Sequence, residues 1–420
     1  MTATARRPHV LVLNQYYRPG VEATANLLAD LCEALAEDYE VTVVTGRVQG
    51  REDLPATELV HGVRVVRARS TAYDRTQLHL RGLNYATYLG DSLFRSLLQR
   101  RPQLVLCMTD PPVVGDLAVV VAHARGAPLL VISEDVFPEI ATQLGRLRNP
   151  VAVRVLQALV SFYLRRADAI VAIGDRMRER LVVKGAPAER VMVIPNWVDT
   201  RAITPQPRDN EWSRAQGLAD RFVVMHSGNV GHAQNLDALV LATTYLRDLE
   251  RLAVPIIGFG ARHVEMEELA ERLEADHVRF LEYQPREALS RSLSAADLHY
   301  VGLARGLAGF VVPSRLYGIL AAGRPVLVAA DAESETARLV EEVGCGVVVP
   351  PDRPDLVAAA IRDAHDGRLD LAAMGAAGRD YVVREADRLV ALGRYRALVA
   401  ALLAAGPDRS GSPFAASSSR

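Results

Sequence analysis

The sequence predicts an α/β protein built from two Rossmann-like, doubly wound domains. Short apolar runs alternate with helical patterns along most of the chain, as is typical of parallel strands and the helices that cover them. At 420 residues the chain is too long for one ordinary core. The polar stretch 199–220 contains Pro205 and Pro207 and has no sustained periodicity, which indicates an interdomain linker.

The first half is predicted to begin with a βαβ unit. Residues 9–13 form a continuous apolar run, residues 23–35 place leucines at helical spacing, and residues 41–45 form the next apolar run. This N-terminal domain is expected to span residues 1–198. Its further strands are expected at 63–67, 104–108, 129–133, 169–173 and 191–194, with helices at 84–99 and 151–165.

The second half repeats the alternation after the linker at 199–220. A strand at 222–227, a helix at 235–246 and a strand at 255–259 open a C-terminal domain expected at 221–385. A closing helix is expected at 386–405, and a disordered tail rich in Ser, Gly and Pro at 406–420. Later strands are expected at 278–281, 298–301, 325–328 and 346–349, with helices at 355–364 and 387–405.

Composition narrows the class of protein. The formal net charge is −1, so no global field favours nucleic acid. The three cysteines, Cys32, Cys107 and Cys345, lie far apart and show no metal-binding spacing, which is typical of buried thiols in a reducing compartment. No stretch approaches the ~18 uninterrupted apolar residues of a membrane span, and the N-terminal apolar run is too short for a secretory signal. We therefore expect a cytoplasmic protein, with peripheral membrane contact left open.

The segment 313–328, PSRLYGILAAGRPVLV, carries the most specific pattern. Ser314 and Arg315 open a short helix that ends in Ala-Ala-Gly before an apolar strand. A helix N-terminus beside an arginine suits a diphosphate, although a generic helix-to-strand turn of an α/β domain is also compatible. The segments HSGNVG at 226–231 and GFGAR at 258–262 add glycines that allow a backbone to approach a ligand closely.

Together with NQYYRPG at 14–20, EDVFPE at 134–139 and PNWVD at 195–199, these segments occur in an order that resembles retaining GT-B glycosyltransferases of family 4. The resemblance is greatest to the WbuB-like branch, whose members transfer amino sugars in exopolysaccharide and O-antigen synthesis. It implies two domains that face a central cleft. It also implies transfer of a sugar, with an N-acetylated amino sugar favoured, from a UDP-linked donor to a hydroxyl of a glycan, lipid-linked or small-molecule acceptor. Retention, no cofactor and no metal are further implications.

The resemblance also implies donor-binding residues. These are Gly20, Gly228, Asn229, Gly231, Gly258, Gly260, Tyr283, Ser314, Arg315, Leu316 and Glu335. The chain departs from the family where an Arg and a Lys are expected, near Asn229 and Gln234, so Arg315 and Arg305 would have to supply the charge. The usual pair of glutamates is also absent, because Phe310 and Gly318 stand at those positions. Glu335 is either a remaining carboxylate near the ribose or a helix N-terminal charge that the dipole favours.

In the first half, Asp135 and Glu139 follow the strand expected at 129–133, where α/β enzymes build their chemistry. They are our catalytic candidates, because a carboxylate can orient an acceptor hydroxyl or take its proton; exposed loop carboxylates are, however, common. The segment 144–166 interleaves arginines with apolar residues. It is either a packed helix with a solvated basic face or a surface that rests on an anionic bilayer.

Two other functions stay open at this point. The lost glutamate pair is compatible with a non-catalytic GT-B homologue that acts as a partner or scaffold for another transferase. A UDP-sugar 2-epimerase shares the architecture, but the acidic and histidine residues that such enzymes use have no clear counterparts in this sequence.

Overall fold

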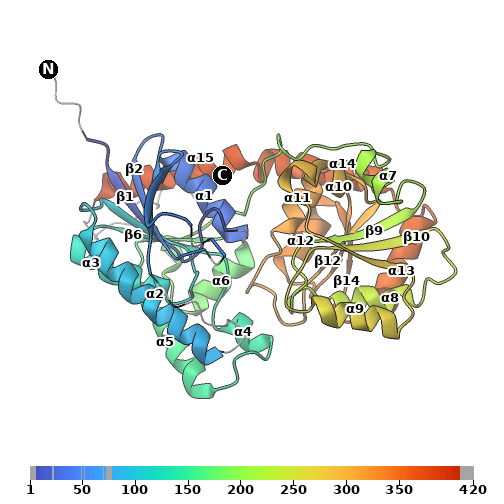
Figure 1. The fold of residues 1–420 in the computed structure, drawn as a ribbon, viewed down its shortest axis with the longest axis horizontal. Coiled ribbons are helices and arrows are strands. Elements are labelled where there is room, and N and C mark those ends of the chain that lie inside the picture. Colours follow the sequence, from blue (N-terminus) through green and yellow to red (C-terminus); the bar gives the residue numbers. More distant parts are fainter. Residues whose placement is uncertain are drawn as a thin grey trace. The chain divides into compact units, whose positions relative to one another are not determined.

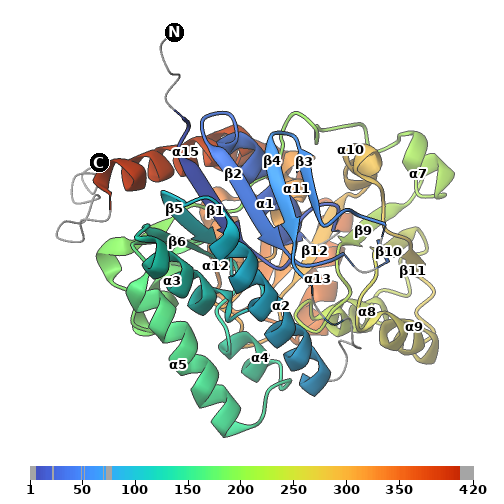
Figure 2. The ribbon, with the colours of Figure 1, turned by 60° about the vertical axis from the view of Figure 1, so that its left-hand side comes forward.

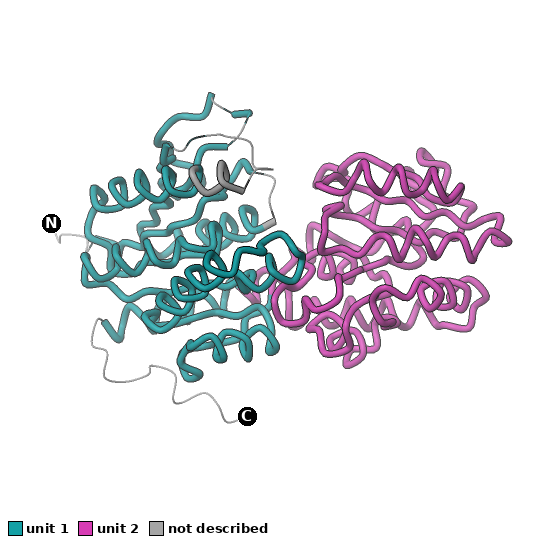
Figure 3. The backbone as a smooth tube through the Cα atoms, turned by 90° about the horizontal axis from the view of Figure 1, so that it is seen from below, with its two compact units in different colours: residues 1–195, 392–420 teal, residues 196–391 magenta. Residues whose placement is uncertain are grey.

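The computed structural model describes residues 6–20, 23–48, 50–51, 53–69, 71 and 78–406. The chain forms two compact units, Met1–Pro195 with Leu392–Arg420, and Asn196–Ala391, which Figure 3 shows in teal and magenta. Each unit is an α/β fold around its own sheet, as the sequence predicts. Residues 407–420 of the predicted tail lie outside the described residues.

Unit 1 is built on an eight-stranded sheet with the strand order β3-β4-β2-β1-β5-β6-β7-β8 in its described part. All strand pairs are parallel except β3 with β4. In register, Val10 of β1 stands opposite Val41 of β2 and Leu104 of β5. The strands are β1 (His9–Leu13), β2 (Glu40–Thr45), β3 (Thr57–Val60), β4 (Val63–Arg67), β5 (Leu104–Cys107), β6 (Leu129–Ser133), β7 (Ala169–Ala172) and β8 (Val191–Val193).

The helices of unit 1 connect these strands. Figures 1 and 2 show α2, α3 and α5 side by side along the sheet, and α3 packs against both α2 and α5. The helices are α1 (Ala23–Leu35), α2 (Leu78–Leu98), α3 (Val114–Arg125), α4 (Glu139–Gln143), α5 (Pro150–Arg166), α6 (Asp175–Val183) and the short 3-10 helix η1 (Ala188–Arg190).

Unit 2 has a six-stranded, all-parallel sheet with the order β11-β10-β9-β12-β13-β14. Neighbouring residues of β9 face opposite layers: Val224 belongs to the core beneath α8 and α13, whereas Val223 and Met225 pack on the other side. This alternation is what a sheet covered on both faces requires. The strands are β9 (Phe222–Ser227), β10 (Leu252–Ile257), β11 (Val278–Leu281), β12 (Leu298–Gly302), β13 (Val326–Ala329) and β14 (Gly346–Val349).

The helices of unit 2 include α14, which the sequence analysis does not predict. The helix expected at 235–246 is shorter in the structure, where it is α8. The helices are α7 (Glu211–Ala215), α8 (Leu236–Thr243), α9 (His263–Arg272), η2 (Arg286–Ala288), α10 (Leu289–Ser294), α11 (Arg315–Ala321), α12 (Glu335–Val343), α13 (Pro354–His365), α14 (Leu371–Glu385) and the first residues of α15 (Arg388–Ala405), which continues into unit 1.

The stretch 199–220 belongs to unit 2 and is not a free linker. The backbone N–H groups of Thr204 and Gln206 donate to the hydroxyls of Ser290 and Ser294, each at 3.0 Å. Arg379 donates to two carbonyl oxygens within the stretch, and its α7 begins at a capping box on Asn210. The polar residues that suggest a linker therefore bond this stretch to unit 2.

Candidate functional site

Two glycine-containing loops meet at the carboxyl ends of β9 and β10. Gly228 and Gly258 follow these strands with φ angles of 144° and 131°, a backbone region that favours glycine. A Cβ atom on Gly258 would lie 2.0 Å from the carbonyl oxygen of Gly228, and one on Gly260 would lie 2.4 Å from the carbonyl oxygen of Val230. The two loops can touch only because these positions lack side chains, so the structure brings Gly228, Gly258 and Gly260 together.

The turn after β9 is held by its own side chains. Gly231 N–H donates to Gln234 Oε1 at 3.0 Å, and the side chain of Asn229 lies where a Cβ on Gly231 or Gly260 would be. Gly302, at the end of β12, is equally close to this turn, because its Cβ would lie 2.1 Å from the carbonyl oxygen of Gln234. Asn229 and Gln234 thus shape the turn, and Gly302 is a residue of the site that the sequence analysis misses.

Arg315 brings a positive charge to these loops. Its side chain lies against Gly228, where an added Cβ would be 3.4 Å from Arg315 Cδ, and its Nη2 donates to the carbonyl oxygen of Gly302 at 3.0 Å. Its Nε is buried and has no hydrogen-bond partner among the described residues. Burial lowers the pKa of Arg315 to about 10, which still leaves the guanidinium charged at neutral pH.

The other groups near Arg315 do not neutralise it. His226, on β9, is fully buried and its Nε2 lies 3.3 Å from the carbonyl oxygen of Asn229. Burial, and then the charge of Arg315, hold the pKa of His226 well below its ordinary value, so the imidazole stays neutral. Among the described residues Arg315 forms no ion pair with a carboxylate. Its charge is therefore available to an anion.

The remaining candidates of unit 2 differ in exposure. Tyr283 is 64% exposed, and Phe259, which sequence reasoning missed, is 67% exposed; they follow the neighbouring strands β11 and β10. Leu316 is fully buried and its N–H donates a hydrogen bond to the carbonyl oxygen of Pro313. Neither its side chain nor its N–H is therefore available to contact a nucleotide sugar. Arg305 is exposed and pairs with Asp352 at 3.2 Å, so it is not an uncompensated charge.

Ser314 and Glu335 lie at two helix N-termini. Ser314 is the N-cap residue of α11 and makes no capping hydrogen bond through its side chain. Glu335 lies in the first turn of α12, whose N-cap Ser334 accepts a hydrogen bond from the N–H of Ala337. This position favours the interpretation of Glu335 as a charge that the helix dipole stabilises.

Unit 1 gathers carboxyl groups at the carboxyl ends of β5 and β6. Asp110 follows β5, and Glu134 and Asp135 follow β6. The N–H of Glu134 donates to Thr109 Oγ1 at 3.2 Å and joins the two loops. Burial, helped by the charges of Asp110 and Glu134, raises the pKa of Asp135 to about 8 from the ordinary 3.8. Asp135 is therefore largely protonated at pH 7.

Unsatisfied amide oxygens lie at the end of the adjoining strand β1. Asn14 Oδ1 and Gln15 Oε1 are buried and have no hydrogen-bond partner in the described part of the chain. The N–H of Gln15 donates to the carbonyl oxygen of Asp110 at 2.8 Å, which links this loop to the carboxyl groups. The first loop also contains Gly20, whose N–H donates to the carbonyl oxygen of Tyr17. Buried polar groups that await partners are a feature of ligand sites.

Glu139 has a different environment from Asp135. It is the first residue of α4, and Lys184 Nζ donates to both of its carboxylate oxygens at 2.7 Å. Gln157 of α5 contacts the same carboxylate at 3.3 Å. Lys184 is only 9% exposed. The ion pair ties α4 to the residue after α6, and the hydrogen bond from Gln157 ties α4 to α5. The geometry gives Glu139 a positioning contact, and a direct catalytic role for it stays a prediction.

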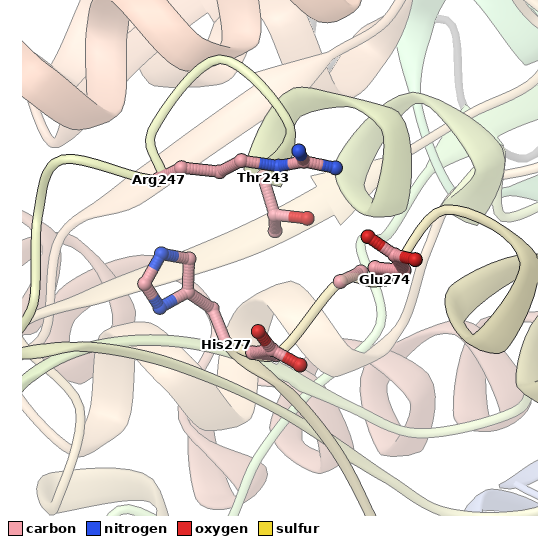
Figure 4. Close-up of a pocket in the computed structure, with 6 residues that line it drawn as sticks. Thr243, Arg247, Glu274 and His277 are labelled. Carbon is pink, nitrogen blue, oxygen red and sulfur yellow. The ribbon is translucent and has the colours of Figure 1, made fainter.

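A separate pocket of unit 2, shown in Figure 4, is lined by residues that precede β10 and β11, at the amino-terminal ends of these strands. It is lined by Thr243, Arg247, Glu274, Ala275, Asp276 and His277. The two ring nitrogens of His277 face the carbonyl oxygens of Leu252 and Leu246, and Arg247 donates to that of Leu273. The side chains of His277 and Arg247 are therefore used in hydrogen bonds within the protein. Ligands of open parallel sheets bind at the carboxyl ends of the strands, so this pocket is not our candidate site.

Within the described ranges, no group of three His, Cys, Asp or Glu side chains is placed to hold a metal ion. None of the helices in the described part is both long and apolar enough to cross a membrane.

Comparison with known proteins identifies both halves of the chain. Residues 20–197 match the family profile described as a glycosyl transferase 4-like domain, and residues 209–381 match that of glycosyl transferases group 1. The probable glycosyltransferase WbjE of Pseudomonas aeruginosa is 28% identical over 72% of this chain and 76% of its own length. The putative colanic acid biosynthesis glycosyl transferase WcaI of Escherichia coli (strain K12) is 28% identical over 73% of this chain and 76% of its own length.

The fold matches a solved structure over nearly its whole length. The structure of Anabaena HepE in complex with UDP-glucose superposes with a TM-score of 0.73 at 15% identity, covering 93% of this chain and 99% of that one. The likeness shows the GT-B fold that the sequence predicts.

Proposed function

We propose that this chain, a glycosyltransferase composed of a 4-like domain followed by a group 1 domain, takes its sugar from a nucleoside diphosphate donor that unit 2 binds. One observation carries the proposal. Arg315 is a charged guanidinium without a carboxylate partner among the described residues, set against glycine loops at the carboxyl ends of β9, β10 and β12. A diphosphate would supply both the missing negative charge and an acceptor for the buried Nε.

The donor is a UDP-sugar in this proposal, with an N-acetylated amino sugar as the group transferred. HepE, which shares the fold, is seen with UDP-glucose, and the exposed rings of Tyr283 and Phe259 are suited to stack on a base. The amino sugar rests on the resemblance to the WbuB-like branch. So do retention of configuration and catalysis without a metal or other cofactor.

The acceptor is a hydroxyl group of a glycan, a glycolipid or a small molecule. Asp135 acts on this hydroxyl in our proposal, either by orienting it or by accepting its proton. A carboxyl with a pKa near 8 is a stronger base, once ionised, than an ordinary aspartate, and general bases work best when their pKa lies near the working pH. The similarity to WcaI, whose name refers to colanic acid biosynthesis, supports polysaccharide synthesis as the setting.

The test is a calorimetric screen of nucleotides and nucleotide sugars, followed by a hydrolysis assay that needs no acceptor. UDP and its sugars should bind, and Arg315→Ala should weaken their binding roughly tenfold or more, because a charge-assisted contact contributes about 1.5–3 kcal/mol. Arg305→Ala is the matched control, since Arg305 is exposed and already paired with Asp352. Unchanged UDP affinity in a folded Arg315→Ala protein, or binding lost equally in the control, would refute the donor site.

A further inference from the structure

Helix α5 has two apolar faces, and the described residues cover only one of them. Val160, Tyr163 and Leu164 are buried against the rest of unit 1. On the other side Val151, Val155, Leu159 and Phe162 are 63%, 53%, 36% and 38% exposed. We call these four residues the α5 stripe. A packed helix whose outer face is basic and solvated, the alternative left open by the sequence, would not expose these four apolar side chains together.

The α5 stripe is continuous along the helix. Its residues are spaced by four, four and three positions, so at 3.6 residues per turn they fall within about 80° of the helix circumference and extend over roughly 16 Å. Asn149 fixes the start of the helix, because its side chain accepts hydrogen bonds from the N–H groups of Val151 and Ala152. The stripe is thus presented by a regular, capped helix of 17 residues.

The helices beside α5 expose apolar side chains too. Val120 of α3 is 50% exposed, and Phe94 and Leu98 near the end of α2 are 62% and 66% exposed. Figure 2 shows α2, α3 and α5 as neighbours, and α3 packs against both of the others. Exposed large apolar residues of unit 1 are therefore concentrated on this helical layer.

Arginines flank the stripe, and no acidic residue occurs anywhere in 144–166. At 3.6 residues per turn, Arg154 and Arg165 project from one side of the stripe, and Arg166 continues the stripe about one turn beyond Phe162. The guanidinium of Arg166 lies over the ring of Phe162, 5.1 Å from its centroid. Within the described part of the chain none of these arginines forms an ion pair. The loop before α5 adds the exposed Arg146 and Arg148.

We propose that the α5 stripe and its flanking arginines form a docking surface for an anionic lipid bilayer, with α5 lying in the plane of the headgroups. Apolar side chains enter the acyl boundary while arginines meet lipid phosphates at its edge. A second copy of this chain is a poorer occupant, because a two-fold interface would place the same arginine-rich face against itself. The inference does not rest on the proposed sugar transfer.

The experiment is co-sedimentation of the full chain with vesicles of phosphatidylcholine, with and without phosphatidylglycerol. The chain should sediment with the anionic vesicles, and added salt should weaken the binding. Val155→Ser/Leu159→Ser should lower the partition coefficient at least tenfold. Arg146→Gln/Arg154→Gln should lower it about 25-fold, since each arginine near an anionic surface contributes about fivefold. The control Val264→Ser/Arg286→Gln, at exposed positions of unit 2, should bind like the parent.

A second readout reports where Phe162 goes. Tryptophan emission of Phe162→Trp, measured as a difference from the parent, should shift to shorter wavelength on addition of anionic vesicles and be quenched by brominated lipids. Absence of parent binding to the anionic vesicles would overturn the proposal, and so would stripe variants that bind like the parent. Light scattering that shows a dimer dissociated by Val155→Ser/Leu159→Ser would instead assign the stripe to self-association.

Discussion

Replacing Asp135 by asparagine should stabilise the protein while it removes the proposed catalytic group. In the folded chain the Asp135 carboxyl is held in its protonated form, with a pKa of about 8, by burial and by the charges of Asp110 and Glu134. In the unfolded chain it ionises near its ordinary value of 3.8. Because the folded pKa is raised, unfolding releases a proton between these two values, and stability from this group falls as pH rises from about 4 to 8.

The size of the effect follows from the difference between the two pKa values. Each pH unit within this window lowers the free energy of unfolding by about 1.4 kcal/mol for one group. Asparagine carries no charge at any pH, so the Asp135→Asn protein lacks this decline. Relative to the parent, the free energy of unfolding of the variant should therefore rise by about 3 kcal/mol between pH 5 and pH 7. The rise is smaller to the extent that Asp110 or Glu134 binds a proton in place of Asp135.

The assay is urea unfolding of both proteins at pH 5, 6 and 7, followed by circular dichroism, with Asp220→Asn as a control at an exposed carboxylate. A difference in stability that stays flat across this range would refute the protonated state of Asp135 at pH 5 to 7. In the activity assay, kcat/KM of the parent should rise toward pH 8, and Asp135→Asn should bind UDP normally while transfer falls about a hundredfold or more. Near-normal transfer would exclude Asp135 as the base.

Two further predictions concern the frame of each site. Gly258→Ala should destabilise unit 2 by about 2–5 kcal/mol and abolish UDP binding, because the new Cβ would collide with the carbonyl oxygen of Gly228 at a position with positive φ. Gly217→Ala is the control: its φ is also positive but its Cβ would lie in open space, so it should cost only about 1 kcal/mol. Equal losses of stability for the two variants in thermal unfolding would contradict the crowding argument. Glu139→Gln should lower the free energy of unfolding by about 2–3 kcal/mol, because it leaves Lys184 without its ion-pair partner. The double variant Glu139→Gln/Lys184→Met should recover part of that stability. A Glu139→Gln protein that keeps its stability but loses transfer activity would instead support a catalytic role for Glu139.

The sheets of both units were predictable because their strands are continuous apolar runs. Residues 9–13 are buried without exception, and such a run has few alternatives to a covered parallel strand. The edge strand β3 escaped prediction because it has only four residues and exposes Leu59 to solvent. The start of β10 was placed too late, at Pro255, because proline is rare within central strands; the structure begins this strand at Leu252.

The candidate sites could be predicted only where a single residue type, such as glycine, indicates them in the sequence. Glycines of the unit 2 loops can be found from the sequence, since few other residues tolerate such close backbone approach. The burial of Arg315, the pairing of Glu139 with Lys184 and the clustering of Asp110 with Asp135 depend on elements far apart in sequence. Nothing local to Glu139 signals Lys184, which lies 45 positions away. Asp135 and Glu139 therefore looked alike in the sequence.

Arg315 and Asp135 present the same physical problem with opposite sign. Each is an ionisable group whose neighbours oppose its charged form. Among the described residues Arg315 has no carboxylate beside it, and Asp135 has other carboxyls instead of a cation. Either arrangement lowers stability, and a folded chain retains such groups where a ligand completes them. A guanidinium without an anion beside it is suited to bind the diphosphate of the donor. A carboxyl with a raised pKa is suited to accept a proton from the acceptor hydroxyl. These two mismatches, more than any sequence motif taken singly, favour an active transferase over a non-catalytic homologue.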